Sequence, residues 1–266
     1  MPQDKPQPLP PILDAKAHGA PSVFRPENLL REARRQKGLV ERPIPPVCVL
    51  DPDGDLVRYL RASGQVRRSA AWACYHTDLH EFEHAGLTFG AVGCAVGAPF
   101  AVLVAEQMFA SGCRLLLSVT SAGQIVDRGP TPYFVLIDRA WRDEGTSYHY
   151  QAPTAFAEAD PVLVEAATRA LAGTPLTVHR GASWTTDAPF RETEAAIEAA
   201  RARGLLAVEM EAAALYAFAR ANGRQVLCFA HVTNQMAQGG DDFEKGAANG
   251  ARDALTLLGT VAAALV

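Results

Sequence analysis

The chain has 266 residues, of which 48% are hydrophobic and 20% are charged, a composition typical of a globular protein with a sizeable core. Its formal net charge of −4 offers no positive field for a nucleic-acid backbone, which argues against nucleic-acid binding. No apolar run approaches the roughly 20 residues that cross a bilayer, which argues against a membrane protein.

Residues 1–22 are rich in Pro, Lys and Asp and contain no apolar stretch, so they are not expected to form a secretory signal. The five cysteines are scattered, with neither a C-x-x-C pair nor a histidine at zinc-like spacing. We therefore expect a cytoplasmic protein with free thiols, no metal site and no cofactor. The cysteines are Cys48, Cys74, Cys94, Cys113 and Cys228.

Residues 1–45 are predicted to form an N-terminal arm with a short charged helix at 27–37, and residues 46–266 a single catalytic domain. In this domain, short runs rich in β-forming residues alternate with helical stretches, whose apolar residues recur three or four apart. The predicted strands are 47–50, 87–92, 115–120, 133–137, 176–179 and 226–233. The predicted helices are 100–110, 161–171, 192–202, 212–221 and 241–266.

This alternation indicates an α/β protein. Continuous apolar runs are typical of strands in a sheet that is covered on both faces, and strand–helix alternation favours parallel pairing. We expect one domain of three layers, in which a central, mostly parallel mixed sheet is flanked by helices. Ligands of such folds bind outside the carboxyl ends of the strands, and several polar segments follow the predicted strands.

Two of these segments contain glycine. Residues 93–99 read GCAVGAP and precede a predicted helix, whose free N–H groups would attract an anion. The segment lacks the spacing of a nucleotide-binding loop, and a plain tight turn is the alternative. Residues 120–123 read TSAG and are predicted to form a second turn, whose hydroxyls would bind a sugar or phosphate, or cap a helix.

Two further segments combine aromatic and polar side chains. Residues 142–150 read RDEGTSYHY and place two tyrosines around His149, which a solvated loop does not require. Residues 184–192 read WTTDAPFRE and supply Phe190 and Arg191, an aromatic face and a cation suited to a planar base. The alternative for this last segment is a proline-containing loop that caps the next helix.

The segment 207–212 reads AVEMEA and carries two carboxylates, Glu209 and Glu211, which face the same way if the stretch is extended. Paired carboxylates can grip a diol or stabilise a cationic ribosyl centre. Acidic residues also favour the start of a helix, which is the plainer interpretation. Residues 231–235 read HVTNQ and offer hydrogen-bonding groups for the edge of a base.

Taken in this order, the segments resemble the nucleoside phosphorylase and nucleosidase superfamily from about Val47 to the C-terminus, and the run VEMEA is the most specific mark. The resemblance implies that Met210 and Glu211 hold the ribose, that Glu211 stabilises the ribosyl charge, and that Glu209 is a ribose or structural partner. His149 would contribute to the ribose site. The nucleophile side would be lined by Gly97, Ser121 and Arg58, and the base by Tyr148, Phe190, Arg191 and Asn234.

The sequence departs from the phosphorylases of this superfamily where phosphate binds. Ser118 replaces an arginine, and the acidic stretch LDPDGDL at 50–56 replaces a turn with glycine and arginine. An acidic turn repels phosphate, although Arg58 or an arginine of a neighbouring subunit could compensate. Asn234 stands where purine-cleaving members carry an aspartate, and an Asn cannot supply a proton, which favours pyrimidine-like chemistry.

The sequence therefore predicts a nucleoside phosphorylase-like enzyme, which cleaves the N-glycosidic bond of a (deoxy)ribonucleoside to free base and ribose 1-phosphate. A nucleosidase that uses water is the first alternative. The hydrolytic members of the superfamily lack the central arginine and carry the sequence Ser-Ala-Gly, which this chain has at residues 121–123. An inactive nucleoside-binding relative is the second. The expected partners are a nucleoside and phosphate or water, and the resemblance implies a homodimer or a hexamer of dimers.

Overall fold

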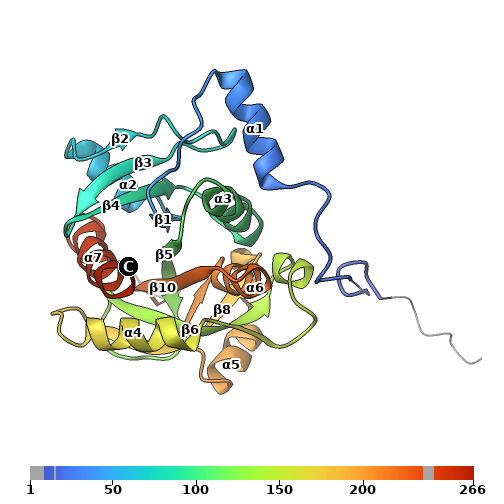
Figure 1. The fold of residues 1–266 in the computed structure, drawn as a ribbon. Helices are drawn as coiled ribbons and strands as arrows, with labels where there is room; N and C mark the ends of the chain where they lie inside the picture. The colour runs from blue at the N-terminus through green and yellow to red at the C-terminus, as the bar shows by residue number, and fades with distance from the viewer. Residues whose placement is uncertain (1–8, 15, 236–242) are drawn as a thin grey trace, which may run out of the picture.

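The protein is described by a computed structural model over residues 9–14, 16–235 and 243–266. A sheet of ten strands forms its centre, and helices cover the sheet on both sides (Figure 1). The strands are β1 (Val47–Asp51), β2 (Arg67–Arg68), β3 (His80–His84), β4 (Leu87–Gly93), β5 (Leu115–Gln124), β6 (Tyr133–Asp143), β7 (Phe156–Glu158), β8 (Val178–Thr186), β9 (Ala207–Glu209) and β10 (Gln225–Asn234). The helices are α1 (Pro26–Lys37), α2 (Asp55–Ala62), α3 (Ala98–Ala110), α4 (Pro161–Leu171), α5 (Glu194–Ala202), α6 (Ala212–Asn222) and α7 (Ala251–Leu265), with 3-10 turns η1 (Thr146–His149) and η2 (Pro189–Arg191).

Strand β5 organises the sheet. Its first half pairs in parallel with β1 on one side and with β10 on the other, and its last residues pair with β9. On the other side of β10, the order of paired strands is β6, β8 and β9. Because β9 also pairs with β5, this part of the sheet curls back onto β5. The longest pairings, β5 with β10 and β6 with β8, are parallel, whereas the edge strands β2 and β3 are antiparallel. The predicted fold class is confirmed.

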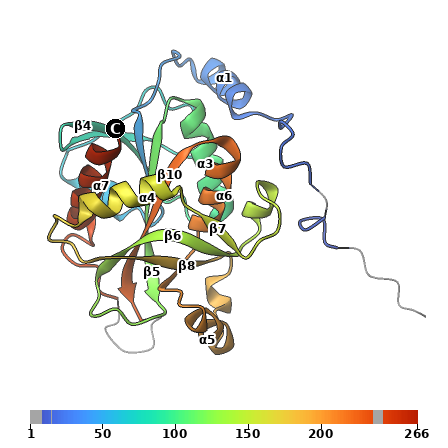
Figure 2. The same cartoon turned by 60° about the horizontal axis from the view of Figure 1, so that its bottom comes forward.

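Two groups of helices enclose the sheet. Helices α2, α7 and α4 contact one another in series on one side, and α1, α3 and α6 do so on the other (Figures 1 and 2). Strand β1 is buried along its whole length, as expected for a central strand covered on both faces. Helix α3 is buried on most of its surface because it lies between α1 and α6.

The helix boundaries follow from local chemistry. Pro161 opens α4 after Asp160, whose side chain accepts a hydrogen bond from the Val162 N–H at 2.8 Å. Thr193 caps α5 in the same way through the Ala196 N–H. At the other end of α6, Gly223 adopts the left-handed conformation that ends a helix without steric strain.

Three sequence predictions are corrected. Residues 120–123 do not form a turn: they continue β5, because β10 and β9 pair with this stretch. The predicted helix at 241–266 is too long, since α7 begins at Ala251 after Gly250, which has a φ of 78°. Residues 241–242 of that prediction lie outside the described residues. Residues 142–143 and 184–186 were expected after strands, yet they belong to β6 and β8.

Several short elements were not predicted, namely α2, β2, β3, β7 and β9. The N-terminal arm folds over η1, where His18 Nε2 lies 3.1 Å from the carbonyl oxygen of Tyr148. All five cysteines are free, and Cys94 is the exposed one. In the described part of the chain, no helix has the length and apolarity needed to cross a membrane.

Candidate active site

Glu211 lies at the centre of the candidate site. It immediately precedes α6 and is almost completely buried, with 1% of its surface exposed. Its Oε1 atom accepts a hydrogen bond of 2.7 Å from the backbone N–H of Gly97. Its Oε2 atom has no hydrogen-bond partner among the described residues. A buried carboxyl oxygen without a partner is unfavourable, so this atom is available to a ligand hydroxyl.

The environment of Glu211 favours its neutral form. Burial raises the pKa of Glu211 to about 8, and the nearby carboxylate of Glu209 acts in the same direction. The Gly97 N–H and the Thr120 hydroxyl oppose this shift by stabilising the charged form. At pH 7 the carboxyl group of Glu211 is therefore largely protonated in the free protein.

Glu209 is engaged within the protein. Its Oε1 atom accepts hydrogen bonds from the hydroxyls of Ser183 at 3.0 Å and Thr185 at 2.5 Å. Its Oε2 atom accepts from the N–H groups of Glu211 and Ala212, both at 2.7 Å. Glu209 thus anchors the start of α6, which favours the structural role over contact with ribose. The backbone turns at Glu211 (φ −132°, ψ −37°), so the two carboxylates are not successive side chains of one extended strand.

The predicted Gly-rich turn joins β4 to α3. Cys94 and Gly97 have positive φ values of 64° and 88°, and Gly97 tolerates this conformation because it has no Cβ. The turn delivers the Gly97 N–H to Glu211 at the start of α3, where N–H groups have no partner within the helix. Gly97 and Glu211, which the sequence assigned to one site, are therefore in direct contact.

The nucleophile side of the site is acidic. The backbone N–H of Ser121 donates to the carboxylate of Asp53 at 2.6 Å. Arg58 donates to the carbonyl oxygen of Asp53 at 2.6 Å and to the Asp55 carboxylate at 2.7 Å, and Lys245 binds the same Asp55 at 2.6 Å. Both cations are thus paired with protein groups rather than free for an anion.

Asp53, Asp55 and Ser121 line a small hollow at the carboxyl end of β1, beside β5 and β10. Burial raises the pKa of Asp51 to about 7, and it lowers the pKa of His231 to about 4. The Nε2 atom of His231 has no hydrogen-bond partner among the described residues. The hollow is lined by Asp51, Asp53, Asp55, Leu56, Val119, Thr120, Ser121, His231, Asn249, Gly250, Ala251 and Ala254.

The predicted base-binding residues are more dispersed. Asn234 ends β10 beside Gly123 of β5 and is 9% exposed. Phe190 and Arg191 lie in η2, where the Phe190 side chain is 99% exposed. Tyr148 is held within its own loop, since its hydroxyl donates to the Arg142 carbonyl oxygen at 3.3 Å.

His149 and Met210 are the remaining residues that the sequence assigned to the site. His149 is exposed and lines hollows beneath the N-terminal arm, together with Glu106 and Tyr150. Met210 is half-buried between Glu209 and Glu211, at the edge of the site.

Sequence reasoning missed the hydroxyls that bind Glu209 and the partner of Ser121. Ser183 and Thr185 alternate along a strand and therefore share a face, a signal that was present in the sequence. Asp53 was recognised only as part of an acidic turn, because its contact with Ser121 spans 68 positions. In residues 9–14, 16–235 and 243–266, no group of three or more His, Cys, Asp or Glu side chains is placed to hold a metal ion.

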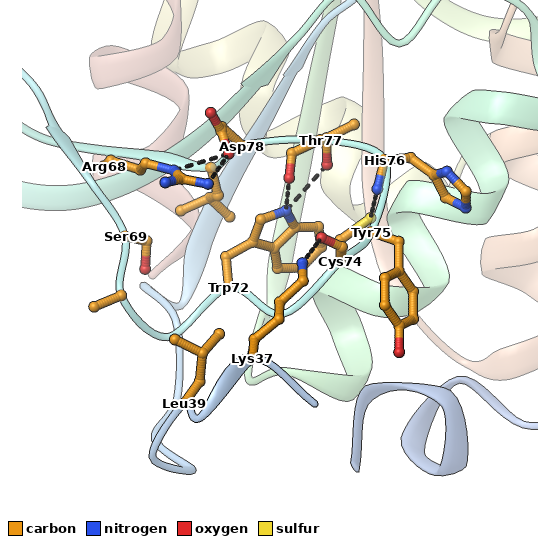
Figure 3. Close-up of a pocket in the computed structure, with 12 residues that line it drawn as sticks. Lys37, Leu39, Arg68, Ser69, Trp72, Cys74, Tyr75, His76, Thr77 and Asp78 are labelled. Carbon is orange, nitrogen blue, oxygen red and sulfur yellow. Dashed lines mark hydrogen bonds and ion pairs between the residues drawn. The ribbon is translucent and has the colours of Figure 1, made fainter. Parts of the chain in front are cut away.

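A separate hollow lies at the end of α1 (Figure 3). Lys37 crosses it and donates to the carbonyl oxygens of Ala73 at 3.0 Å and Cys74 at 2.6 Å, and Figure 3 shows the contact with Cys74. Arg68 pairs with Asp78 on its other side. None of the residues that the sequence assigned to the site lines this hollow, so we place the site at Glu211.

The fold and the polar groups near the carboxyl ends of its strands define an α/β protein with a buried acidic cluster. The chain belongs to the phosphorylase superfamily, whose sequence profile matches residues 46–265. The expected family is thereby confirmed.

Two crystal structures of uridine phosphorylase from Vibrio fischeri have a similar fold. One is a complex with 6-hydroxy-1-naphthoic acid: it superposes with a TM-score of 0.71 at 21% identity, over 84% of this chain and 92% of that one. The other superposes with a TM-score of 0.70 at 23% identity, over 85% of this chain and 95% of that one. At these identities the likeness concerns the fold.

Proposed function

We propose that the protein cleaves the N-glycosidic bond of a (deoxy)ribonucleoside, as a nucleoside phosphorylase-like enzyme. The observation that carries the proposal is the buried carboxyl group of Glu211, which the Gly97 N–H holds by one oxygen while the other oxygen has no partner among residues 9–14, 16–235 and 243–266. Membership of the phosphorylase superfamily and the fold shared with uridine phosphorylase support the same reaction class.

In this mechanism, Met210 and Glu211 position the ribose, and the free oxygen of Glu211 binds a sugar hydroxyl. The C1′–N bond breaks with its electron pair leaving on the base, so C1′ becomes positively charged. The ionised form of Glu211, which is buried, stabilises that charge, an effect that is typically a large part of catalysis. Asn234 stabilises the departing base by a hydrogen bond, and the base takes its proton from solvent.

The acceptor on the opposite face of C1′ is phosphate in the phosphorylase reaction, which gives ribose 1-phosphate. The N–H of Ser121 and the guanidinium of Arg58 are the groups suited to hold it. Phosphate must then displace the Asp53 carboxylate from Ser121 and share Arg58 with Asp55.

Hydrolysis is the second candidate, and one specific observation favours it. The Asp53 carboxylate already occupies the Ser121 N–H that an anion would use, and Asp51 and Asp55 add to the acidity of the hollow. A neutral water molecule meets no repulsion there, and Asp53 is placed to accept its hydrogen bond.

Base release from uridine, inosine, AMP and methylthioadenosine, with and without phosphate, tests the proposal. Release that requires phosphate supports phosphorolysis, and equal release in phosphate-free buffer supports hydrolysis. Absence of release under both conditions, together with thermal stabilisation by a nucleoside, would contradict catalysis and indicate a nucleoside-binding protein instead.

A further inference from the structure

A second cavity, of about 550 Å³, lies between the N-terminal arm, α1, α3 and η1, and we call it the arm cavity. Glu211 is not among its lining residues. Its walls are largely apolar and come from segments that are distant in sequence. The apolar wall residues are Ile12, Phe24, Pro26, Leu29, Pro99, Val102 and Leu103.

The charged groups of the arm cavity are all acidic. Glu106 and Asp187 line it, and no Lys or Arg does. His149 also lines it, but burial first, and then the charges of Lys16 and His18, lower the pKa of His149, so its ring is neutral at pH 7. The cavity therefore repels anions and attracts cations.

Glu106 is half-buried on α3, and within the described residues no ion pair joins it to a cation. Its one hydrogen bond comes from the Tyr150 hydroxyl, which donates to Oε1 at 2.5 Å. Because Glu106 lies beside apolar walls without an ion-pair partner, a bound cation would stabilise its negative charge.

The neighbouring Gln107 adds a second unfilled acceptor. It is 2% exposed and lines the same cavity. Its amide nitrogen donates to the Leu103 carbonyl oxygen at 3.1 Å, whereas its Oε1 atom has no hydrogen-bond partner among the described residues. Buried side-chain oxygens are nearly always hydrogen-bonded, so this atom marks a place for a donor.

We propose that the arm cavity binds an organic ammonium ion with an aromatic body. The ammonium group carries several N–H donors, one for the Glu106 carboxylate and one for the Gln107 carbonyl oxygen. The aromatic body fills the apolar space between Phe24, Val102 and Leu103. A cavity of this volume with apolar walls and few converging polar groups is typical of small-molecule sites.

Calorimetric titration with 2-phenylethylammonium, 2-phenylethanol and 3-phenylpropionate tests the proposal on the full chain. The ammonium ion should bind at least tenfold more tightly than the alcohol, which has a similar body without the charge, and the carboxylate should not bind. Glu106→Gln should weaken ammonium binding at least tenfold and leave alcohol binding unchanged. Glu27→Gln, an exposed position on the adjacent α1, is the matched control and should bind like the wild type.

Equal affinities for the ammonium ion and the alcohol, unaltered binding by Glu106→Gln, or no binding at all would overturn the proposal. Glu211→Gln should retain ammonium binding, because Glu211 does not line the arm cavity. Loss of binding in that variant would place the ligand at the candidate active site and would equally refute a separate site.

Discussion

The Oε1 atom of Glu211 accepts a hydrogen bond of 2.7 Å from the backbone N–H of Gly97, across a separation of 114 residues. This contact joins the start of α6 to the turn between β4 and α3, at the edge of the sheet where the parallel strands end. It fixes one carboxyl oxygen, whereas the other has no hydrogen-bond partner in the part of the chain that the structure describes. The backbone thus orients the group that the proposed reaction needs.

Glu209→Ala should destabilise the protein. It should leave Ser121 and Arg58, which the sequence assigned to the nucleophile side, in place. The substitution leaves two buried N–H groups and two hydroxyls without their acceptor. We expect the free energy of unfolding to fall by about 3 kcal/mol, in the range of buried hydrogen-bonding groups left unsatisfied. Urea denaturation measures this change. A loss below about 0.5 kcal/mol would show that Glu209 does not anchor α6.

Asp53→Ala should increase the affinity for phosphate. The change frees the Ser121 N–H and removes one negative charge from the hollow. We expect the Kd of phosphate, measured by calorimetry, to fall at least tenfold. Asp127→Ala, which removes an exposed carboxylate that also accepts a backbone N–H, that of Gly129, is the control and should leave the Kd unchanged. An unaltered Kd in Asp53→Ala would contradict the view that Asp53 occupies an anion site.

The contribution of Glu192 to the stability of the protein should decrease as the pH rises from about 4.5 to about 7. Burial raises the pKa of Glu192 from 4.5 to about 7, so over this range the folded protein holds a proton that the unfolded chain releases. Glu192→Gln should therefore show a smaller decline in the free energy of unfolding between pH 5 and pH 8. Glu194→Gln, an exposed position two residues further on, should decline like the wild type.

The activity should increase with pH up to about 8. Stabilisation of a positive ribosyl centre requires ionised Glu211, whose pKa is raised to about 8 by burial and by Glu209. The profile of kcat/KM reports groups of the free enzyme, so its rising limb should have a midpoint near that value. Asp51→Asn removes the group with a pKa of about 7 and should leave this limb in place. A profile that is flat from pH 6 to 9 would contradict this role of Glu211.

Much of the fold could be predicted because hydrophobic periodicity is a local property. Helix α4 matches its predicted range, and the predicted central strands overlap β1, β4, β5 and β10. The predictions failed where pairing with strands that are distant in sequence determines the local structure. The stretch 120–123 contains turn-forming residues, yet it is a strand because β10 and β9 pair with it. Strand β9 has three residues, too few for a periodic signal.

The candidate site was predictable in part. The run 208–212 identified Glu211, and the glycines of 93–99 identified the turn that binds it. The different roles of the two carboxylates were not predictable, because the hydroxyls that bind Glu209 Oε1 come from β8, more than twenty positions away. The contact between Asp53 and Ser121 depends on the pairing of β1 with β5 in the same way.

The most direct test of the account is turnover by Glu211→Gln. The amide keeps the size of the side chain and an oxygen for the Gly97 N–H, but it loses the negative charge. We predict that kcat for base release falls by about 10²–10³-fold while the melting temperature does not decrease. Glu198→Gln, an exposed position on α5, should match the wild type. Wild-type turnover in Glu211→Gln would contradict the assignment of this carboxylate to catalysis.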